Sequence, residues 1–129
     1  MVHDFLRYIT DDLCNLLPVY GFQGRGLEYV KQHDHVVSCI GVQTHSSEPR
    51  CCVNLGVHLD FLPILGGTGP VKLESMNVTY CEIRRRLTPS PSLDDFWWSY
   101  GEGGARQGLL AVLEEHGLPF FAKYESFPD

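Results

Sequence analysis

The sequence predicts an α+β protein: an antiparallel sheet of about four to five strands, with an N-terminal helix and C-terminal helices packed mainly on one face. Apolar residues recur at every second position through the middle of the chain and at helical spacing near both ends. The 129 residues are 43% hydrophobic and 20% charged, which is ordinary for a globular protein. We therefore expect one domain over residues 1–129 with a substantial core.

The N-terminal helix is expected over residues 4–17. Its polar residues lie mostly opposite its apolar stripe, and the acids in its first half suit the positive end of the helix dipole. Pro18 and Gly21 are expected to end it. The stripe that should cover one face of the sheet consists of Phe5, Leu6, Ile9, Leu13, Leu16 and Leu17.

Three consecutive strands are expected to form the centre of the sheet as an antiparallel meander. A short strand at Phe22 leads through a glycine-containing turn into a strand over residues 27–32. A polar corner at residues 33–35 then leads into a strand over residues 36–44, and a loop leads into a third strand over residues 50–60.

The strand over residues 50–60 is expected to organise the rest of the chain. Its alternation predicts one apolar side that faces the core. The other side, which carries Asn54 and His58, is expected to meet water or a partner. The residues of the core-facing side are Val53, Leu55, Val57 and Leu59.

The pattern is less regular after residue 60. The glycine-rich segment 66–70 lacks the ending of a phosphate loop and is expected to be a flexible connection. Residues 80–87 are expected to form a fourth strand. We expect one face to carry Cys81, Ile83, Arg85 and Leu87, and the other to carry Glu82, Arg84 and Arg86. The arginine run could bind phosphate or carboxylate, or neutralise acidic helices of its own fold.

Two adjacent tryptophans follow a proline-rich break. Residues 94–100 are expected to deliver Phe96 and either Trp97 or Trp98 to the core. Adjacent side chains cannot both point the same way, so the other tryptophan should be partly exposed, where it could anchor a partner.

The C-terminal part is expected to be helical. A second helix is predicted over residues 104–116, and His116 and Gly117 are expected to stop it. Pro119 then suits the first position of a last helical turn.

Acidic residues are concentrated near the C-terminus. The formal net charge is −6, and residues 94–129 hold seven acids against two bases, a net of −5. Such a surface repels phosphate backbones and attracts basic ones, so a basic protein is a better partner than nucleic acid. No apolar stretch is long enough to cross a membrane, and the N-terminus lacks the features of a signal peptide. We therefore expect a cytoplasmic protein without a membrane partner.

The cysteines and histidines do not form a recognisable site. The five cysteines are odd in number and have no C-x-x-C spacing, so we expect reduced thiols that act as small apolar side chains. His33, His35 and His58 are too few and too loosely placed for a zinc site. Cys52 and His58 are separated by roughly 20 Å along one strand, too far for a catalytic pair. We expect no catalytic residue, metal or cofactor.

Several short motifs occur in a fixed order along the chain. They are Gly21-Phe22, Val53-Asn-Leu-Gly56, Arg86-Leu87, Asp95-Phe-Trp-Trp98 and Leu118-Pro-Phe-Phe121. In this combination the chain resembles the bacterial family called domain of unknown function 4304, over nearly its whole length. The family supplies no catalytic residues to transfer. Small acidic cytosolic proteins of this sort occur among immunity proteins of bacterial toxin systems, so the resemblance implies that role.

The first functional hypothesis is therefore a binding protein, not an enzyme. It would be an immunity protein of a toxin–antitoxin or contact-dependent inhibition system, and it would neutralise a basic toxin such as a nuclease by protein–protein contact. The candidate partner-binding residues are Asp94, Asp95, Trp98, Tyr100, Glu102, Glu114 and Glu115.

The second hypothesis is a small-ligand-binding or enzymatic domain that uses the polar face of the sheet. Its candidate residues are Gln43, Asn54, His58, Arg84 and Arg86. This hypothesis requires a pocket around His58 and Arg84. A third is an oligomerising module, and the sequence leaves the oligomeric state open.

Overall fold

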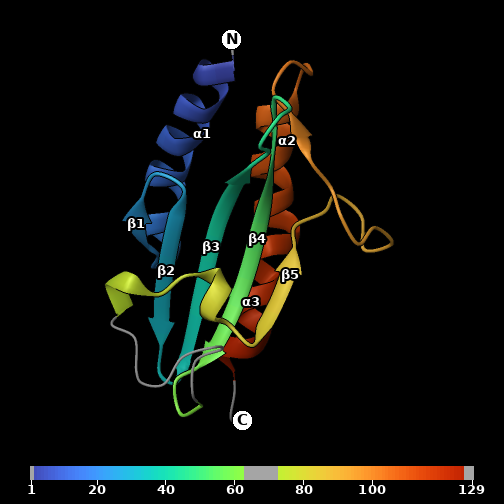
Figure 1. Cartoon of the computed structure of the whole chain (residues 1–129). Helices are drawn as coiled ribbons and strands as arrows, with labels where there is room; N and C mark the ends of the chain where they lie inside the picture. Colours follow the sequence, from blue (N-terminus) through green and yellow to red (C-terminus); the bar gives the residue numbers. More distant parts are fainter. Residues whose placement is uncertain (1, 63–72, 127–129) are drawn as a thin grey trace.

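The computed structural model describes residues 2–62 and 73–126, and the glycine-rich segment expected to be a flexible connection lies outside them. The described residues form an α+β fold in which a six-stranded antiparallel sheet carries an N-terminal helix and C-terminal helices (Figure 1). The predicted fold class is confirmed, with one more strand than expected because Trp98–Ser99 adds a short pair to the sheet.

The central meander agrees closely with its prediction. Its strands are β2 (Glu28–His33), β3 (Val36–Thr44) and β4 (Arg50–Leu59), and β1 (Gln23–Arg25) precedes them at one edge. The hairpin between β2 and β3 turns at Asp34, which adopts a left-handed φ of 52°. Strand β4 pairs with β3 over the full length of β3 and also with β5 and β6, so the predicted organising strand is central.

Strand β5 is shorter than expected, at Ile83–Arg86. Residues Val78–Tyr80 form a 3-10 turn instead, because the Asn77 side chain accepts a hydrogen bond from the Thr79 backbone N–H. This turn corrects the placement of Cys81, which packs on the opposite side of the sheet from Leu87.

Helix α1 (Val2–Leu16) and the helices α2 (Ala105–Val112) and α3 (Leu118–Glu125) lie on one side of the sheet (Figure 1). The predicted stripe of α1 faces the core through its fully buried members. The apolar cluster on this side includes Ile9, Leu13, Ile40, Val53, Leu55, Val57, Leu109, Leu113 and Phe121. No helix among the described residues is long and apolar enough to cross a membrane.

The expected helix stop at His116 and Gly117 is wrong. The chain continues from α2 to α3 through a π-helical turn over Leu113–Gly117, and Gly117 keeps a right-handed φ of −74°. Its lack of a side chain serves packing, because an added Cβ would lie 2.8 Å from Leu113 Cδ1. A proline ring normally clashes with the carbonyl four residues earlier, and the wider π-turn gives Pro119 the room that it needs inside a continuous helix.

A second, smaller cluster covers much of the other side of the sheet. It consists of Val30, Val37, Cys39, Met76 and Cys81. The segment 73–81 crosses this side in front of the strands (Figure 1). The expectation that this face of β4 meets water is therefore wrong for Cys52, Gly56 and His58, which are buried.

Candidate functional site

The uncovered part of the helix-free face contains an open groove of about 560 Å³. Within it, Asn54 Nδ2 donates to Gln43 Oε1 at 2.9 Å, and Arg86 Nε donates to Asn54 Oδ1 at 2.8 Å. The strand register explains the meeting of these side chains, since Asn54 lies opposite Arg86 in the β4–β5 pair. Arg84 also lines the groove, so four of the five residues proposed for ligand binding lie together.

His58, the fifth residue of that set, does not line the groove. It is buried, and its Nδ1 lies 2.8 Å from Glu82 Oε2. The other oxygen of Glu82 accepts the backbone N–H of Leu59 at 2.7 Å. The expectation of a pocket around both His58 and Arg84 is therefore wrong, because the buried His58 pairs with Glu82, and Glu82 lines the groove in its place.

A rigid loop end lies beside the groove. Asp95 forms an ion pair with Arg86. Its carboxylate also accepts a hydrogen bond from the backbone N–H of Phe96 at 2.9 Å and one from Trp97 Nε1 at 3.3 Å. The Trp97 ring lies near two guanidinium groups, 5.1 Å from that of Arg50 and 5.3 Å from that of Arg86. These contacts fix the end of the 88–97 loop against the sheet.

The structure corrects the choice of tryptophan. Trp98 is only 6% exposed and packs in the core with Phe96, so its ring is not available to a partner. Trp97 is half-buried and is the member of the pair that reaches the helix-free side. A clue was present in the sequence, because Phe96 and Trp98 are two residues apart and share a face of an extended chain, which leaves Trp97 on the other.

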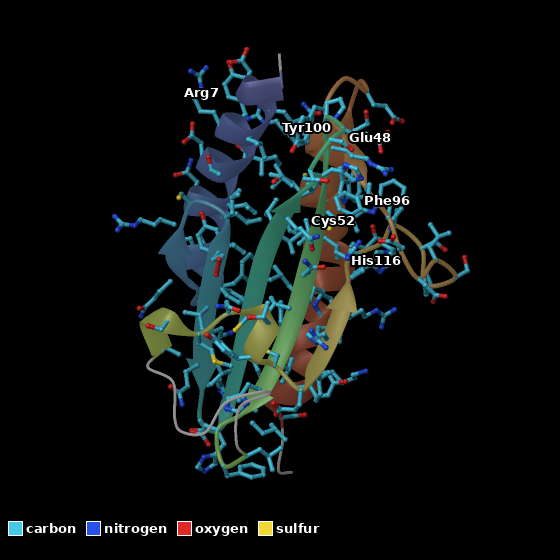
Figure 2. All side chains as sticks on the ribbon, in the orientation of Figure 1. Arg7, Glu48, Cys52, Phe96, Tyr100 and His116 are labelled. Atoms are coloured by element: carbon cyan, nitrogen blue, oxygen red, sulfur yellow. The ribbon has the colours of Figure 1, made fainter. Side chains whose placement is uncertain are left out.

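Tyr100 is also engaged within the molecule. Its ring stacks on that of Phe5 from α1, with the ring centres 4.7 Å apart. Burial and the neighbouring Cys51 thiol raise the pKa of Tyr100 to about 12. Figure 2 shows Tyr100 at the same end of the sheet as Glu48 and Phe96. This position favours a packing role over the anchoring role that we predicted.

The proposed acidic residues lie on three separate elements. Asp94 and Asp95 belong to the loop before β6, and Glu102 belongs to the turn before α2. Glu114 and Glu115 belong to the π-turn, where Glu114 Oε2 accepts a hydrogen bond from the Tyr20 hydroxyl at 3.3 Å. The set therefore does not form one contiguous motif, and Asp94 and Glu102 are exposed members that form no ion pair among the described residues.

The thiols are poorly suited to nucleophilic chemistry. Four of the five are buried, as expected for small apolar side chains, and Cys14 is exposed. Burial raises the pKa of Cys51 to about 12, and burial also raises the pKa of Cys52. The pKa of Cys39 is raised by its hydrogen bond with Cys81 and by burial. Because the thiolate is the reactive form, the raised pKa values make Cys39, Cys51 and Cys52 inert at neutral pH.

Histidines and acids do not converge into a metal site within residues 2–62 and 73–126, where no group of three or more potential ligands occurs. His35 Nδ1 instead lies 2.9 Å from Asp60 Oδ1, across the end of the sheet.

A further pocket escaped the sequence reasoning. It lies between β5, the residues that follow it and the helix around the π-turn, with a volume of about 240 Å³. Arg85, His116 and Lys123 line it from three different parts of the chain. The helix stop expected at Gly117 concealed this pocket, because His116 and Lys123 come together only if the helix continues.

The comparisons with known proteins give one match. Residues 13–123 match the family described as domain of unknown function DUF4304. Neither a curated protein nor a solved structure matches the chain.

Proposed function

We propose that this chain, which belongs to the DUF4304 family of domains of unknown function, is a binding protein whose partner is a basic protein domain. In this proposal it acts in the cytoplasm as an immunity protein of a bacterial toxin system. It covers the active site of a basic toxin, such as a nuclease, with acidic groups. The proposal makes it a non-enzymatic protein.

The observation that carries this proposal is the preorganised acidic loop end. Asp95 is held by Arg86 and by two N–H donors, so the adjacent Asp94 is presented on a fixed backbone. A binding surface that is already ordered loses less conformational freedom on association. The half-buried Trp97 ring lies beside it and offers apolar area to the same partner.

The charge balance supports a basic partner. Among the described C-terminal acids, Asp95 pairs with Arg86 and Glu125 pairs with Lys31 at 3.0 Å. Asp94 and Glu102 have no basic partner among the described residues and are exposed. Uncompensated surface charge accelerates the encounter with an oppositely charged protein.

The test is co-expression with a toxic domain, which the proposal expects to be encoded by a gene beside that of this chain. The wild-type protein should restore growth, and the double variant Asp94→Lys/Glu102→Lys should lower protection and slow association by about tenfold or more at low salt. Asp95 is left unchanged because its carboxylate holds the loop.

Asp11→Lys provides the matched control, since Asp11 is an exposed acid on α1. It should keep full protection. Equal protection by the wild-type protein and the double variant would remove the acidic loop from the proposal, and failure of the wild-type protein to protect would overturn the immunity role.

The groove favours a second candidate function, the binding of a small polar ligand on the sheet face. The side chains of Gln43, Asn54 and Arg86 are already joined by hydrogen bonds there, and Arg84 has no carboxylate partner among the described residues. Ligand titration followed by NMR would test it, because the side-chain amides of Gln43 and Asn54 report directly on the groove. An unchanged position of both amide signals with every ligand tried would reject it.

A further inference from the structure

We propose that the pocket between β5 and α3 binds a small organic anion, with a carboxylate or phosphate group on an apolar body. The proposal does not rest on the immunity role, because the basic side chains that carry it, Arg85, His116 and Lys123, lie outside the acidic loop end; Arg86, which pairs with Asp95, also lines the pocket. The lining residues that carry it are Arg85, Leu87, Thr88, His116, Phe120 and Lys123.

The first observation is the convergence of cationic groups from separate elements. Arg85 lies opposite Leu55 in the β4–β5 pair, so the strand register places it on the helix side of the sheet, whereas the alternation places Arg84 and Arg86 on the other side. His116 comes from the π-turn and Lys123 from α3. Figure 2 shows His116 on the helix behind the sheet, near the 88–97 loop.

The second observation is that two of these cations lack an acidic partner. Five lysine and arginine side chains form ion pairs, with Asp4, Asp12, Glu48, Asp95 and Glu125. Arg85 and Lys123, like Arg25 and Arg84, have no carboxylate within ion-pair distance among the described residues, and the Lys123 ammonium lies 5.1 Å from the centre of the Tyr124 ring. An anion in the pocket would meet two uncommitted positive charges.

The third observation concerns the helix. Single π-turns in α-helices occur frequently at functional sites, where they change the direction of side chains. Here the π-turn places His116 at the pocket, and Gly117 lies beside Leu87 just after β5, where a Cβ at Gly117 would lie 3.4 Å from Leu87 Cδ1, an ordinary contact. The same irregularity therefore builds one wall of the pocket.

The shape and lining define the class of ligand. A volume of about 240 Å³ lies below the range of roughly 300–1,000 Å³ for drug-sized ligands, so the occupant is a small molecule. Arg85 can donate two parallel hydrogen bonds to a carboxylate or phosphate group. Leu87 and Phe120 supply the apolar contact for the body of the ligand.

The test is an NMR titration of the whole chain with four probes: benzoate, phenyl phosphate, inorganic phosphate and the neutral analogue benzamide. Benzoate or phenyl phosphate should shift the backbone amides of Thr88, Phe120 and Lys123. Benzamide should bind about tenfold more weakly or worse, because it cannot accept a charge-assisted hydrogen bond. Whichever of benzoate and phenyl phosphate binds more tightly shows whether the pocket prefers a carboxylate or a phosphate group.

The variant Arg85→Gln/Lys123→Gln should weaken the binding of the anionic probes by about tenfold or more while its spectrum remains that of a folded protein. The matched control is Arg25→Gln, which removes another exposed arginine at the opposite edge of the sheet, in β1. This control should bind like the wild type.

Three results would overturn the proposal. They are the absence of shifts at millimolar benzoate and phenyl phosphate, equal binding of benzamide and benzoate, and unchanged affinity in the double variant. Shifts confined to the side-chain amides of Gln43 and Asn54 would also overturn it and would assign anion binding to the sheet-face groove.

Discussion

The two faces of the sheet are covered in different ways. On one face, three helices bury a cluster that includes Ile9, Leu13 and Phe121. On the other face, the short segment 73–81 buries a cluster of five residues, two of them cysteines. A helix supplies a long apolar stripe, whereas a few irregular turns supply only scattered side chains. The second face is therefore only partly covered, and polar side chains occupy the remainder.

This difference separates the contributions to stability and binding. The helix-covered face buries the larger apolar area and should provide most of the free energy of unfolding. The uncovered part of the other face carries the hydrogen-bonded side chains of Gln43, Asn54 and Arg86. The β5 edge lies between the two, and its arginines line a cavity on each side.

The largest expected effect is on the helix-covered face. Phe121 is 1% exposed and packs against Phe22, with the ring centres 5.4 Å apart. Phe121→Ala should lower the free energy of unfolding by about 3–5 kcal/mol, through lost burial and a cavity. Met76→Ala, in the small cluster, should lower the free energy of unfolding by about 2 kcal/mol, which is the low end of the range for a buried Leu, Ile or Met replaced by Ala.

Urea unfolding followed by circular dichroism measures both variants. If Met76→Ala costs as much as Phe121→Ala, the two faces contribute equally and the comparison fails.

The elements with regular periodicity were predictable from the sequence. Strand β4 was found because residues 50–60 alternate, β3 was placed between the polar corner at residues 33–35 and the loop that follows residue 44, and α1 was found because its stripe recurs at helical spacing. The cover over the second face was not predictable, since a 3-10 turn capped by Asn77 has no periodic signature. His58 was misjudged for this reason: its polarity suggested exposure, but its ring is buried and pairs with Glu82 at the surface of the sheet.

The candidate sites also divide into one that the sequence pattern predicted and one that it did not. The groove residues were predicted together because the alternation of two neighbouring strands places Asn54 and Arg86 on one face. The pocket behind β5 was missed because Gly117 resembles a helix stop in sequence, and its close packing against the Leu113 side chain appears only in the structure.

An intermediate effect on stability is expected on the face covered by segment 73–81, where two glycines should respond differently to replacement by alanine. A Cβ at Gly56 would lie 2.8 Å from Cys81 Sγ, whereas a Cβ at Gly41 would lie 3.6 Å from Val78 Cγ2, an ordinary contact. Gly56→Ala should therefore cost about 1–3 kcal/mol in unfolding free energy. Gly41→Ala should change it by less than about 0.5 kcal/mol, which makes it the matched control.

Urea midpoints compared across the two alanine variants test how tightly segment 73–81 is held. A neutral Gly56→Ala would mean that the segment moves away without loss, and that the cover on this face is loose.

The smallest effect concerns alkaline pH and belongs to the helix-covered face. Burial is the first cause that raises the pKa of Tyr100 to about 12, and it also raises that of Cys51 to about 12. The folded protein therefore keeps protons that the unfolded chain releases at about pH 9–10. The stability contributed by these neutral groups is complete below that pH and is lost as the pH rises to about 12.

Tyr100→Phe sharpens this prediction, because phenylalanine keeps the stacking on Phe5 but has no proton to lose. The urea midpoint of the wild type should fall between about pH 9 and pH 12, and that of the variant should fall less steeply over the same range. Parallel curves would mean that the Tyr100 hydroxyl reaches water in the folded state. The packed end of the helix-covered face would then be as open as the groove side, since burial of the Tyr100 ring, which stacks on Phe5 of α1, is the first cause of its raised pKa.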